Sequence, residues 1–280
     1  MPLKKLIVDS GSTKAEWCVL SENQPISYFT SGLSPYFLNE SQIVEVIVTS
    51  LLPQIGSIVV DEIYFYGTGC KNPINKAFVK SALLSVFPNA YVEVDHDLMG
   101  AARGLCGNSS GIACILGTGS NSCFFDGEII LKNSPGLGYV LGDEGSGAYL
   151  GKRVLQYYLY KTFDDELLHR FDEKFNLKAE EILDKIYKQP LANRYLATFA
   201  MFLQENRGHY MVENIIEDGI NDFFFNHLLT YKENNEYPIH FLGSVAFGFQ
   251  DMIRSLGDDY GFTIGKIVKN PIAGLIEFHQ

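Results

Sequence analysis

Two glycine-centred turns between apolar segments constrain the fold of this 280-residue chain more than any other feature. The first turn occupies residues 9–14, and the second, at residues 117–121, directly follows the apolar run 111–116. Each turn leads into another apolar run, and a third apolar segment follows a polar break, at residues 25–29 and 128–131. This pattern predicts a unit of strand, glycine turn, returning strand and third strand that occurs twice. Two such units, one opening the chain and one near its middle, indicate two related half-domains.

The composition of the two turns indicates what they bind. Glycine allows the backbone to approach a ligand closely and to aim its N–H groups at an anion. Thr118 and Ser120 add hydroxyl donors to the second turn. The sequence therefore predicts phosphate binding, with a nucleotide held between the two turns.

Strands and helices alternate between the two units. Apolar residues at helical spacing predict helices at 41–52, with Ser41 as the N-cap, and at 75–86, whereas residues 63–66 and 91–94 are typical of strands. Such alternation predicts an α/β fold with helices packed on a largely parallel sheet.

An acidic sequence, Asp95-His96-Asp97, follows the last of these strands. In open α/β sheets a ligand binds beyond the carboxyl ends of the strands, so a carboxylate in this position is well placed for chemistry. The alternative is that one aspartate only caps a helix that starts here, and the position alone does not decide between capping and function. The second glycine turn, a short distance further along the chain, favours the functional one.

A glycine-rich segment at residues 133–151 contains Asp143 and Glu144. Each glycine raises the conformational entropy that folding has to overcome, so close approach to a ligand explains this composition better than stability does. Apolar periodicity returns at about Ser146 and predicts a helix from there.

The rest of the chain completes the second half. Residues 154–235 have a mostly helical pattern, and a strand at 237–242 enters Gly243 and Ser244. A strand and a terminal helix are expected over residues 262–278. Because no linker rich in Pro, Gly and Ser interrupts the chain, the repeat itself places the domain boundary close to Ser109.

Composition excludes several classes of function. The chain has 33 acidic and 22 basic residues and a formal charge of −11, which argues against nonspecific nucleic-acid binding. No apolar run is long enough to span a bilayer, so we expect neither a membrane partner nor secretion, and the predicted location is the cytoplasm. The five cysteines form no C-x-x-C pair, which gives little support to a disulfide framework or a zinc site.

Taken together and in their order along the chain, these motifs resemble the sugar kinase branch of the actin, hexokinase and Hsp70-like ATPases. Within that branch they are similar to the N-acetylglucosamine kinase family, which belongs to the BadF/BadG/BcrA/BcrD ATPase group. The matching segments are the first phosphate motif at 9–14, the second at 117–121, the adenosine motif at 242–245, the catalytic aspartate Asp97 and the sugar-binding signature at 142–146. The last of these matches is the most specific.

The resemblance, which covers nearly the whole chain, implies an α/β protein of two ribonuclease H-like, or actin-like ATPase, domains with a nucleotide and sugar cleft between them. The expected domains are residues 1–109 and 110–270. The C-terminal helix at 271–280 is a candidate to complete the first domain.

The implied activity is ATP-dependent phosphorylation of a sugar hydroxyl, in that family the one on carbon 6, with an amino sugar such as N-acetylglucosamine as substrate and Mg²⁺ as cofactor. Asp97 is the implied base for the hydroxyl proton, and Asp9 the group that orients Mg²⁺ through its water shell. The implied ATP-binding residues are Gly11, Ser12, Thr13, Lys14, Gly117, Thr118, Gly119, Gly243 and Ser244. The implied sugar-binding residues are Ser34, Asn121, Gly136, Leu137, Gly138, Asp143 and Glu144.

Two segments depart from the family pattern. Relatives have an asparagine after Gly-Leu-Ser-Thr, where this chain has Pro35 and Tyr36 after Ser34. They also have Gly-Gly-Trp before the acidic signature, where this chain has Pro135-Gly136-Leu137, so an aromatic wall near the acetamido group is absent. The identity of the sugar therefore stays open.

Two functions of other classes are alternatives. One is a non-catalytic sensor that binds ATP and a sugar, and the other is an activator ATPase that serves an iron-sulfur dehydratase. The activator fits poorly, because the cysteines are scattered rather than arranged to ligate a cluster. By analogy with relatives, the expected assembly is a homodimer.

Overall fold

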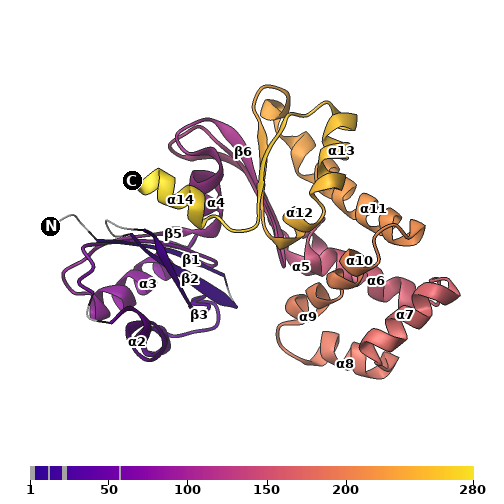
Figure 1. Ribbon diagram of the computed structural model, residues 1–280, viewed down its shortest axis with the longest axis horizontal. Helices are drawn as coiled ribbons and strands as arrows, with labels where there is room; N and C mark the ends of the chain where they lie inside the picture. Colours follow the sequence, from indigo (N-terminus) through magenta and orange to yellow (C-terminus); the bar gives the residue numbers. More distant parts are fainter. Residues whose placement is uncertain (1–3, 12, 21–23, 57) are drawn as a thin grey trace. The chain divides into compact units, whose positions relative to one another are not determined.

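The computed structural model describes residues 4–11, 13–20, 24–56 and 58–280 of the chain (Figure 1). These residues form two compact units. One contains the described residues up to Ser109 together with Gly127–Ile129 and Pro271–Gln280, and the other contains Ser110–Asp126 and Ile130–Asn270. Among the described residues, no helix has both the length and the hydropathy needed to cross a membrane.

The first unit is built on a five-stranded sheet with the order β3-β2-β1-β4-β5. Its strands are β1 (Lys5–Ser10), β2 (Lys14–Leu20), β3 (Ile26–Ser31), β4 (Glu62–Gly67) and β5 (Tyr91–His96). β1, β2 and β3 pair antiparallel because short turns join them, and β1, β4 and β5 pair parallel. The sheet is therefore mixed, and the expectation of a largely parallel sheet was wrong for its first three strands.

The second unit repeats this sheet. Its strands are β6 (Gly111–Leu116), β7 (Ser120–Phe125), β8 (Ile130–Ser134), β9 (Ile239–Leu242) and β10 (Ile264–Val268). Starting from β8, the order is β8-β7-β6-β9-β10, with antiparallel pairs among the first three and parallel pairs among the last three. The predicted repeat of strand, glycine turn and two further strands is confirmed.

Helices cover both faces of the first sheet. They are α1 (Glu40–Val46), a π-helical turn (Ile47–Leu51), α2 (Leu52–Ile55), α3 (Pro73–Val86), α4 (Asp97–Cys106) and α14 (Ile272–His279). Leu6 and Val8 of β1 share a buried core with Ile43 of α1 and Val79 of α3. Strand residues alternate between faces, so Tyr64 and Tyr66 of β4 point to the opposite side, where both rings contact His279 of α14.

The contacts of His279 attach the C-terminal helix to the first unit. Its Nε2 lies 2.8 Å from the Tyr66 hydroxyl, and its ring stacks on Tyr64 with 3.8 Å between the ring centroids. Arg103 of α4 donates both to the Tyr66 hydroxyl at 2.8 Å and to Glu93 at 2.7 Å. Burial, aided by the Arg103 charge, lowers the pKa of His279 to about 4. A neutral imidazole is therefore part of the packed structure.

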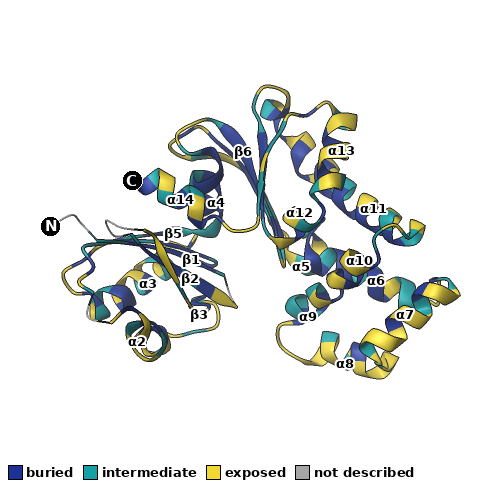
Figure 2. Ribbon diagram, in the orientation of Figure 1, coloured by how far each residue is buried: buried dark blue, intermediate teal, exposed yellow. Residues whose placement is uncertain are grey.

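The second unit carries most of the helices of the chain. They are α5 (Gly138–Leu141), α6 (Gly147–Leu159), α7 (Asp165–Phe175), α8 (Ala179–Lys188), α9 (Ala192–Thr198), α10 (Ala200–Glu205), α11 (Tyr210–Asn226), the 3₁₀ turns Leu228–Thr230 and Lys232–Asn235, α12 (Ser244–Gly248) and α13 (Gln250–Tyr260). Phe223 and Phe224 of α11 are fully buried in a core that includes Phe241 of β9. Figure 2 shows α7 and α8 largely exposed on their outer sides.

Candidate active site

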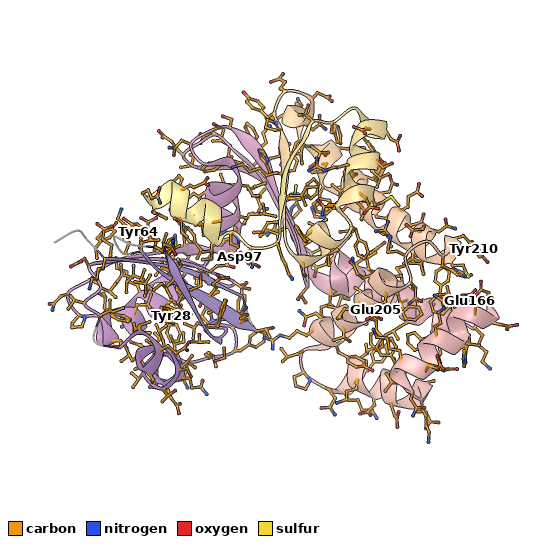
Figure 3. The ribbon with its side chains drawn as sticks, in the orientation of Figure 1. Tyr28, Tyr64, Asp97, Glu166, Glu205 and Tyr210 are labelled. Carbon is orange, nitrogen blue, oxygen red and sulfur yellow. The ribbon has the colours of Figure 1, made fainter. Side chains whose placement is uncertain are left out.

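Asp9 and Asp97 lie at the carboxyl ends of parallel strands in the first unit. Asp9 is the penultimate residue of β1. Asp97, labelled in Figure 3, follows β5 directly as the first residue of α4. Between them, β4 ends in Gly67 and leads into Thr68. The Thr68 hydroxyl donates to Asp97 Oδ2 at 2.9 Å, and the Thr68 amide donates to the carbonyl of Ser10 at 3.0 Å. Thr68 thus connects the ends of the two acidic strands.

The surroundings of Asp9 strongly shift its pKa. Burial, together with the nearby carboxylates of Asp97 and Glu16, raises the pKa of Asp9 to about 7. A cation with a preference for oxygen ligands would offset the repulsion that Asp97 and Glu16 exert on an ionised Asp9. Among the described residues, no three acidic, histidine or cysteine side chains converge as a complete metal site. This arrangement suits Mg²⁺, which commonly keeps several waters and takes few protein carboxylates.

Asp95 and Asp97 have different partners despite their proximity in sequence. Asp95 Oδ1 forms an ion pair with Lys76 Nζ at 3.0 Å. Asp97 instead accepts hydrogen bonds from Thr68 and from the Leu98 amide, the latter at 2.9 Å. Asp97 is also an acidic residue in the first turn of α4, where the helix dipole stabilises its negative charge. The structure therefore separates an aspartate paired with a lysine from one whose two carboxylate oxygens are held by hydrogen bonds.

The first glycine turn is a tight connection between β1 and β2. The Gly11 amide donates to the Lys14 carbonyl at 3.0 Å, and Ser12, a predicted phosphate ligand, lies outside the described residues. Thr13 is exposed, and its carbonyl accepts from the Gly32 amide at 3.0 Å. The Lys14 ammonium lies 3.7 Å from the centre of the Phe29 ring. These contacts involve backbone atoms of the turn and the Lys14 ammonium, and none of them uses the Thr13 side chain.

The second glycine turn is braced by the start of α6. The Gly147 and Ala148 amides donate to the carbonyls of Gly117 and Thr118 at 2.8 and 3.0 Å. The sequence predicted a helix from about Ser146, and the Ser146 hydroxyl caps α6 there by accepting from the Tyr149 amide at 3.2 Å. The first amides of α6 donate to carbonyls of the turn. The N-terminus of this helix therefore fixes the turn, and these amides are not left to bind an anion.

Asp143 lies against this turn. It has a left-handed backbone conformation, with φ of 58°, and its Oδ1 accepts from the Ser120 amide at 3.4 Å. A Cβ atom on Gly119 would lie 3.0 Å from Asp143 Oδ2, so a side chain here would require the carboxylate to shift. Burial raises the pKa of Asp143, although the Ser120 amide opposes this. The predicted sugar signature and the predicted phosphate turn therefore meet in the second unit.

Gly243 of the predicted adenosine motif also packs on the second turn. Its φ is 125°, and a Cβ atom there would lie 2.2 Å from the carbonyl oxygen of Leu116. The chain's own backbone thus requires glycine at this position. The resemblance implied a different reason, a contact with adenine or ribose. Ser244 follows as the first residue of α12.

The remaining predicted sugar residues have varied surroundings. Asn121 Oδ1 accepts from Asn133 Nδ2 at 2.9 Å. Leu137 is 57% exposed, and its flanking glycines, Gly136 and Gly138, have open space where a Cβ atom would be. Ser34 belongs to the first unit and is buried in its turn, with its hydroxyl accepting from the Tyr36 amide at 3.4 Å.

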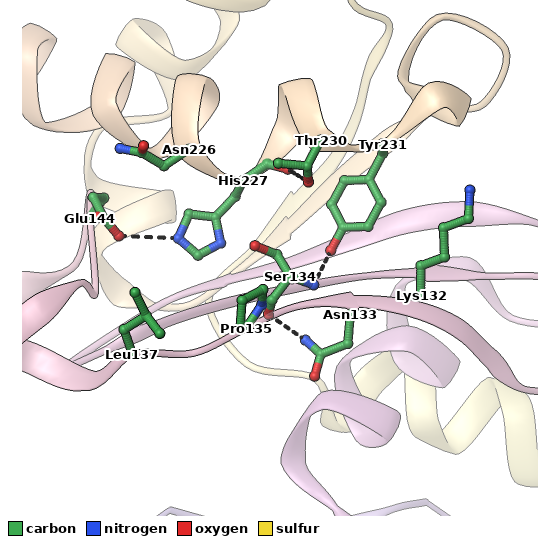
Figure 4. Close-up of a pocket in the computed structure, with 10 residues that line it drawn as sticks. All are labelled: Lys132, Asn133, Ser134, Pro135, Leu137, Glu144, Asn226, His227, Thr230 and Tyr231. Carbon is green, nitrogen blue, oxygen red and sulfur yellow. Dashed lines mark hydrogen bonds and ion pairs between the residues drawn. The ribbon is translucent and has the colours of Figure 1, made fainter.

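A pocket of about 420 Å³ lies beside Glu144 in the second unit (Figure 4). Glu144 Oε2 is 3.2 Å from Nε2 of His227, a residue that sequence reasoning did not single out. The lining residues are Lys132, Asn133, Ser134, Pro135, Leu137, Glu144, Asn226, His227, Thr230 and Tyr231. No motif marks His227, because its partner is 83 residues away along the chain and only the fold brings the two together.

Comparisons with known proteins identify relatives with the same fold. No protein-family model and no curated protein matches the sequence. A solved structure of a candidate N-acetylglucosamine kinase from Porphyromonas gingivalis is 39% identical, with 98% of each chain covered and a TM-score of 0.94.

More distant structures share the fold alone. A candidate N-acetylglucosamine kinase from Chromobacterium violaceum is 17% identical over 99% of each chain, with a TM-score of 0.72. A ROK-family glucokinase from Streptomyces griseus, solved with glucose and AMPPNP, is 14% identical over 98% of this chain and 97% of its own, with a TM-score of 0.57. Identity and coverage at the level of the first comparison show that this chain belongs to the N-acetylglucosamine kinase family of actin-like ATPase sugar kinases.

Proposed function

We propose that this protein transfers the γ-phosphoryl group of ATP to a hydroxyl of an amino sugar such as N-acetylglucosamine, at carbon 6. Membership of a sugar kinase family supports the reaction class. The observation that carries the proposal is the Asp97 carboxylate, held by Thr68 at the carboxyl edge of the sheet and beside the perturbed Asp9.

Asp97 serves as the general base. It takes the proton of the attacking sugar hydroxyl while the oxygen forms a bond to the γ-phosphorus and the bond to the departing ADP breaks. Thr68 holds one carboxylate oxygen, which fixes the orientation of the group. Phosphoryl transfer depends mainly on position and charge, so a fixed base is a substantial part of what the protein can supply.

Asp9 is the residue that would hold Mg²⁺, through the water shell of the ion. Bound there, the ion supplies positive charge that offsets the phosphates of ATP. The glycine turns would bind the phosphates through Gly11, Ser12, Thr13, Lys14, Gly117, Thr118 and Gly119, with Gly243 and Ser244 next to the nucleoside. Asp143 and Asn121 would hydrogen-bond the hydroxyls of the sugar, with Glu144, Leu137 and the adjacent glycines around it and Ser34 as a further contact.

The five cysteines argue against the activator ATPase. All of them are buried, whereas a cluster shared between subunits needs thiolates at a surface. A non-catalytic sensor would have no use for a positioned base, so the Thr68–Asp97 contact also favours the kinase.

A coupled ADP-release assay tests the proposal. With Mg-ATP and a panel of N-acetylglucosamine, N-acetylmannosamine, glucosamine and glucose, we expect turnover with at least one amino sugar. Asp97→Asn should lower kcat by roughly 100-fold or more. Asp95→Asn is the matched control, because its loss of the Lys76 ion pair should affect stability and leave most of the activity. Absence of sugar-stimulated ADP release in a protein that still binds ATP would contradict the proposal.

A further inference from the structure

A second cavity, of about 580 Å³, lies among the helices of the second unit and has no part in the proposed function. Its volume is within the range that small-molecule sites commonly have. Residues of α6 that line it are three or four positions apart and so share one face of that helix: Lys152, Leu155 and Leu159. Residues of α8 that line it share a face in the same way: Leu183, Ile186 and Tyr187. The cavity is therefore a groove between two helix faces, which we call the α6–α8 groove.

The α6–α8 groove has a buried floor and an exposed rim. Leu155 of α6 and Leu196 of α9 line it and are each only 3% exposed. Val140 of α5 and Tyr187 of α8 also line it, yet they are 68% and 80% exposed. Large apolar side chains that stay exposed around an apolar hollow are typical of a ligand-binding groove, because a ligand would remove them from water. We therefore expect the body of the ligand to be apolar.

One cation lines the α6–α8 groove. It is the Lys152 ammonium, and no lining residue that the structure describes carries a carboxylate. Among the described residues, the Lys152 side chain forms no ion pair and no hydrogen bond, and its ammonium lies 5.1 Å from the centre of the Tyr149 ring. A cation–π contact does not neutralise the charge, so an anion can still pair with it. The groove thus combines apolar walls with a single positive charge.

The length and the charge of the α6–α8 groove limit what it can hold. From Lys152 to Leu159 the helix rises by about 10 Å, at ~1.5 Å per residue. A medium-chain alkyl group has a similar reach. A head with one negative charge matches the single ammonium, whereas a dianionic phosphate would bring excess negative charge to a chain whose formal charge is already −11.

We propose that the α6–α8 groove binds a medium-chain fatty acid, with its carboxylate paired to Lys152 and its alkyl chain packed between Leu155, Leu159 and the lining face of α8. None of the described residues that line the groove is among those assigned to ATP or the sugar. The fatty acid is therefore an effector of the protein rather than a substrate.

The groove is connected to the proposed sugar site in two ways. Tyr139 and Val140 line the groove and directly follow Gly138, which the proposed function assigns to the sugar. Burial raises the pKa of Asp143, and the Lys152 charge is among the groups that oppose this rise. A carboxylate bound to Lys152 would offset that charge and make Asp143 a poorer acceptor for the sugar hydroxyls. This effect on the sugar rests on the proposed kinase function, whereas binding of the fatty acid does not.

Isothermal titration calorimetry of the full chain with butanoate, hexanoate, octanoate, decanoate and dodecanoate tests the site. We expect one fatty acid per chain, and each added methylene should strengthen binding by up to roughly fourfold while it becomes buried. The gain should stop near the length of the groove, so dodecanoate should bind little better than decanoate. Absence of binding would overturn the proposal. So would a continued gain with several molecules per chain, which would show adsorption on general apolar surface.

The role of Lys152 is tested by the ratio of the Kd of 1-octanol to the Kd of octanoate. Lys152→Met should lower this ratio by roughly fivefold, through loss of a partly exposed ion pair, and Lys152→Arg should retain most of it. Lys185→Met is the matched control, because Lys185 is exposed on α8 and does not line the groove. An unchanged ratio in Lys152→Met would overturn the assignment of a carboxylate.

Leu183→Glu tests the wall that α8 provides. It places a carboxylate beside the alkyl chain and should weaken octanoate binding by roughly tenfold or more, with no change in the oligomeric state measured by sedimentation equilibrium. An unchanged affinity in the folded variant would overturn the proposal. If the variant dissociates an oligomer and the wild type binds no octanoate, this face is a contact between subunits and the proposal also fails.

Steady-state kinetics tests the link to the sugar. Octanoate should raise the KM of the sugar severalfold in the wild type and in Lys185→Met, but not in Lys152→Met. An unchanged KM in an enzyme that binds octanoate would overturn this link. Should no sugar be phosphorylated, the proposed function fails, and the calorimetry still decides whether the groove binds a fatty acid.

Discussion

The Thr68 hydroxyl donates a 2.9 Å hydrogen bond to Oδ2 of Asp97, and the Thr68 amide is bound to the carbonyl of Ser10. One residue therefore sets the orientation of the proposed base with respect to the strand that carries Asp9. The base is positioned by the end of a neighbouring strand as well as by its own helix.

Removing this hydroxyl should impair catalysis more than binding. Thr68→Val keeps the shape of the side chain but leaves Asp97 without one donor, and we expect kcat to fall by roughly tenfold or more. The KM values for ATP and sugar should change little, because Thr68 holds the base rather than a substrate. Steady-state kinetics measures both, and Thr68→Ser should restore kcat. A rise in KM with kcat unchanged would contradict the positioning role.

Asp9 should make stability depend on both pH and Mg²⁺. Its pKa in the folded protein, about 7, exceeds the ordinary value of 3.8, so between these values the folded state holds a proton that the unfolded state has lost. The contribution of Asp9 to stability is therefore present below about pH 4 and is lost as pH rises towards 7. We expect Asp9→Asn to melt higher than the wild type at pH 8 in EDTA, with a smaller difference at pH 5.

Added Mg²⁺ provides the companion measurement. It should raise the melting temperature of the wild type more at pH 8 than at pH 5, because the ion competes with the proton for Asp9. Asp9→Asn should lose most of this increment. If the variant and the wild type gain equally from Mg²⁺ at pH 8, Asp9 does not hold the ion.

Gly119 should be intolerant of a side chain for a reason that concerns the sugar. In Gly119→Ala the new methyl group would lie 3.0 Å from Asp143 Oδ2 and push the carboxylate away. A displaced substrate ligand should lower kcat/KM for the sugar by roughly 10- to 100-fold. Gly117→Ala is the matched control for the sugar, since its Cβ has no neighbour within 4 Å, and an effect through the phosphates of ATP should appear in the KM of ATP instead. Similar effects of the two variants on the KM of the sugar would contradict this account.

His279 should make the first unit sensitive to acid. Its folded pKa of about 4 is below the ordinary 6.5, so the unfolded chain takes up a proton first as the pH falls. The stability that neutral His279 contributes is complete above about pH 6.5 and is lost progressively down to about pH 4. His279→Phe should lower the free energy of unfolding at pH 7.5 by about 1–3 kcal/mol, through the lost bond to Tyr66, and flatten the decline on acidification.

Urea denaturation at several pH values between 7.5 and 4.5 measures this effect. His169→Phe is the control, because that histidine lies on α7 with its side chain 72% exposed. The control should follow the wild type throughout. A decline of the same steepness in His279→Phe as in the wild type would assign the acid sensitivity to other groups, such as His240, whose pKa burial also lowers to about 4.

Local signals in the sequence predicted the local parts of the structure. The helix expected from about Ser146 is confirmed, because the apolar periodicity that predicted it depends on residues only three or four apart. The cap at Ser41 was wrong. Asn39 begins that helix instead, with its side chain accepting from the Gln42 amide while Gln42 caps the Asn39 amide in return. Residues 39–42 are all polar, so composition alone could not distinguish Asn39 from Ser41 as the cap.

Contacts between distant residues were beyond the reach of the sequence. Nothing near His227 signals that its ring will meet Glu144, and nothing near Gly243 signals that the obstacle to a side chain is the Leu116 carbonyl. Thr68 was similarly hidden, since its partner Asp97 follows a different strand. Motifs therefore suggested the site residues, and the fold shows which side chains contact them.

The attachment of α14 to the first unit has a consequence for synthesis on the ribosome. The strands of that unit are made before α14, so the face of the sheet that carries Tyr64 and Tyr66 stays incompletely covered until His279 has been synthesised. The second unit, encoded almost entirely between Ser110 and Asn270, has its whole sequence available earlier. Synthesis of these strands is therefore separated from synthesis of the helix that helps to cover them by nearly the whole of the second unit, and the first unit cannot complete its packing until α14 has left the ribosome.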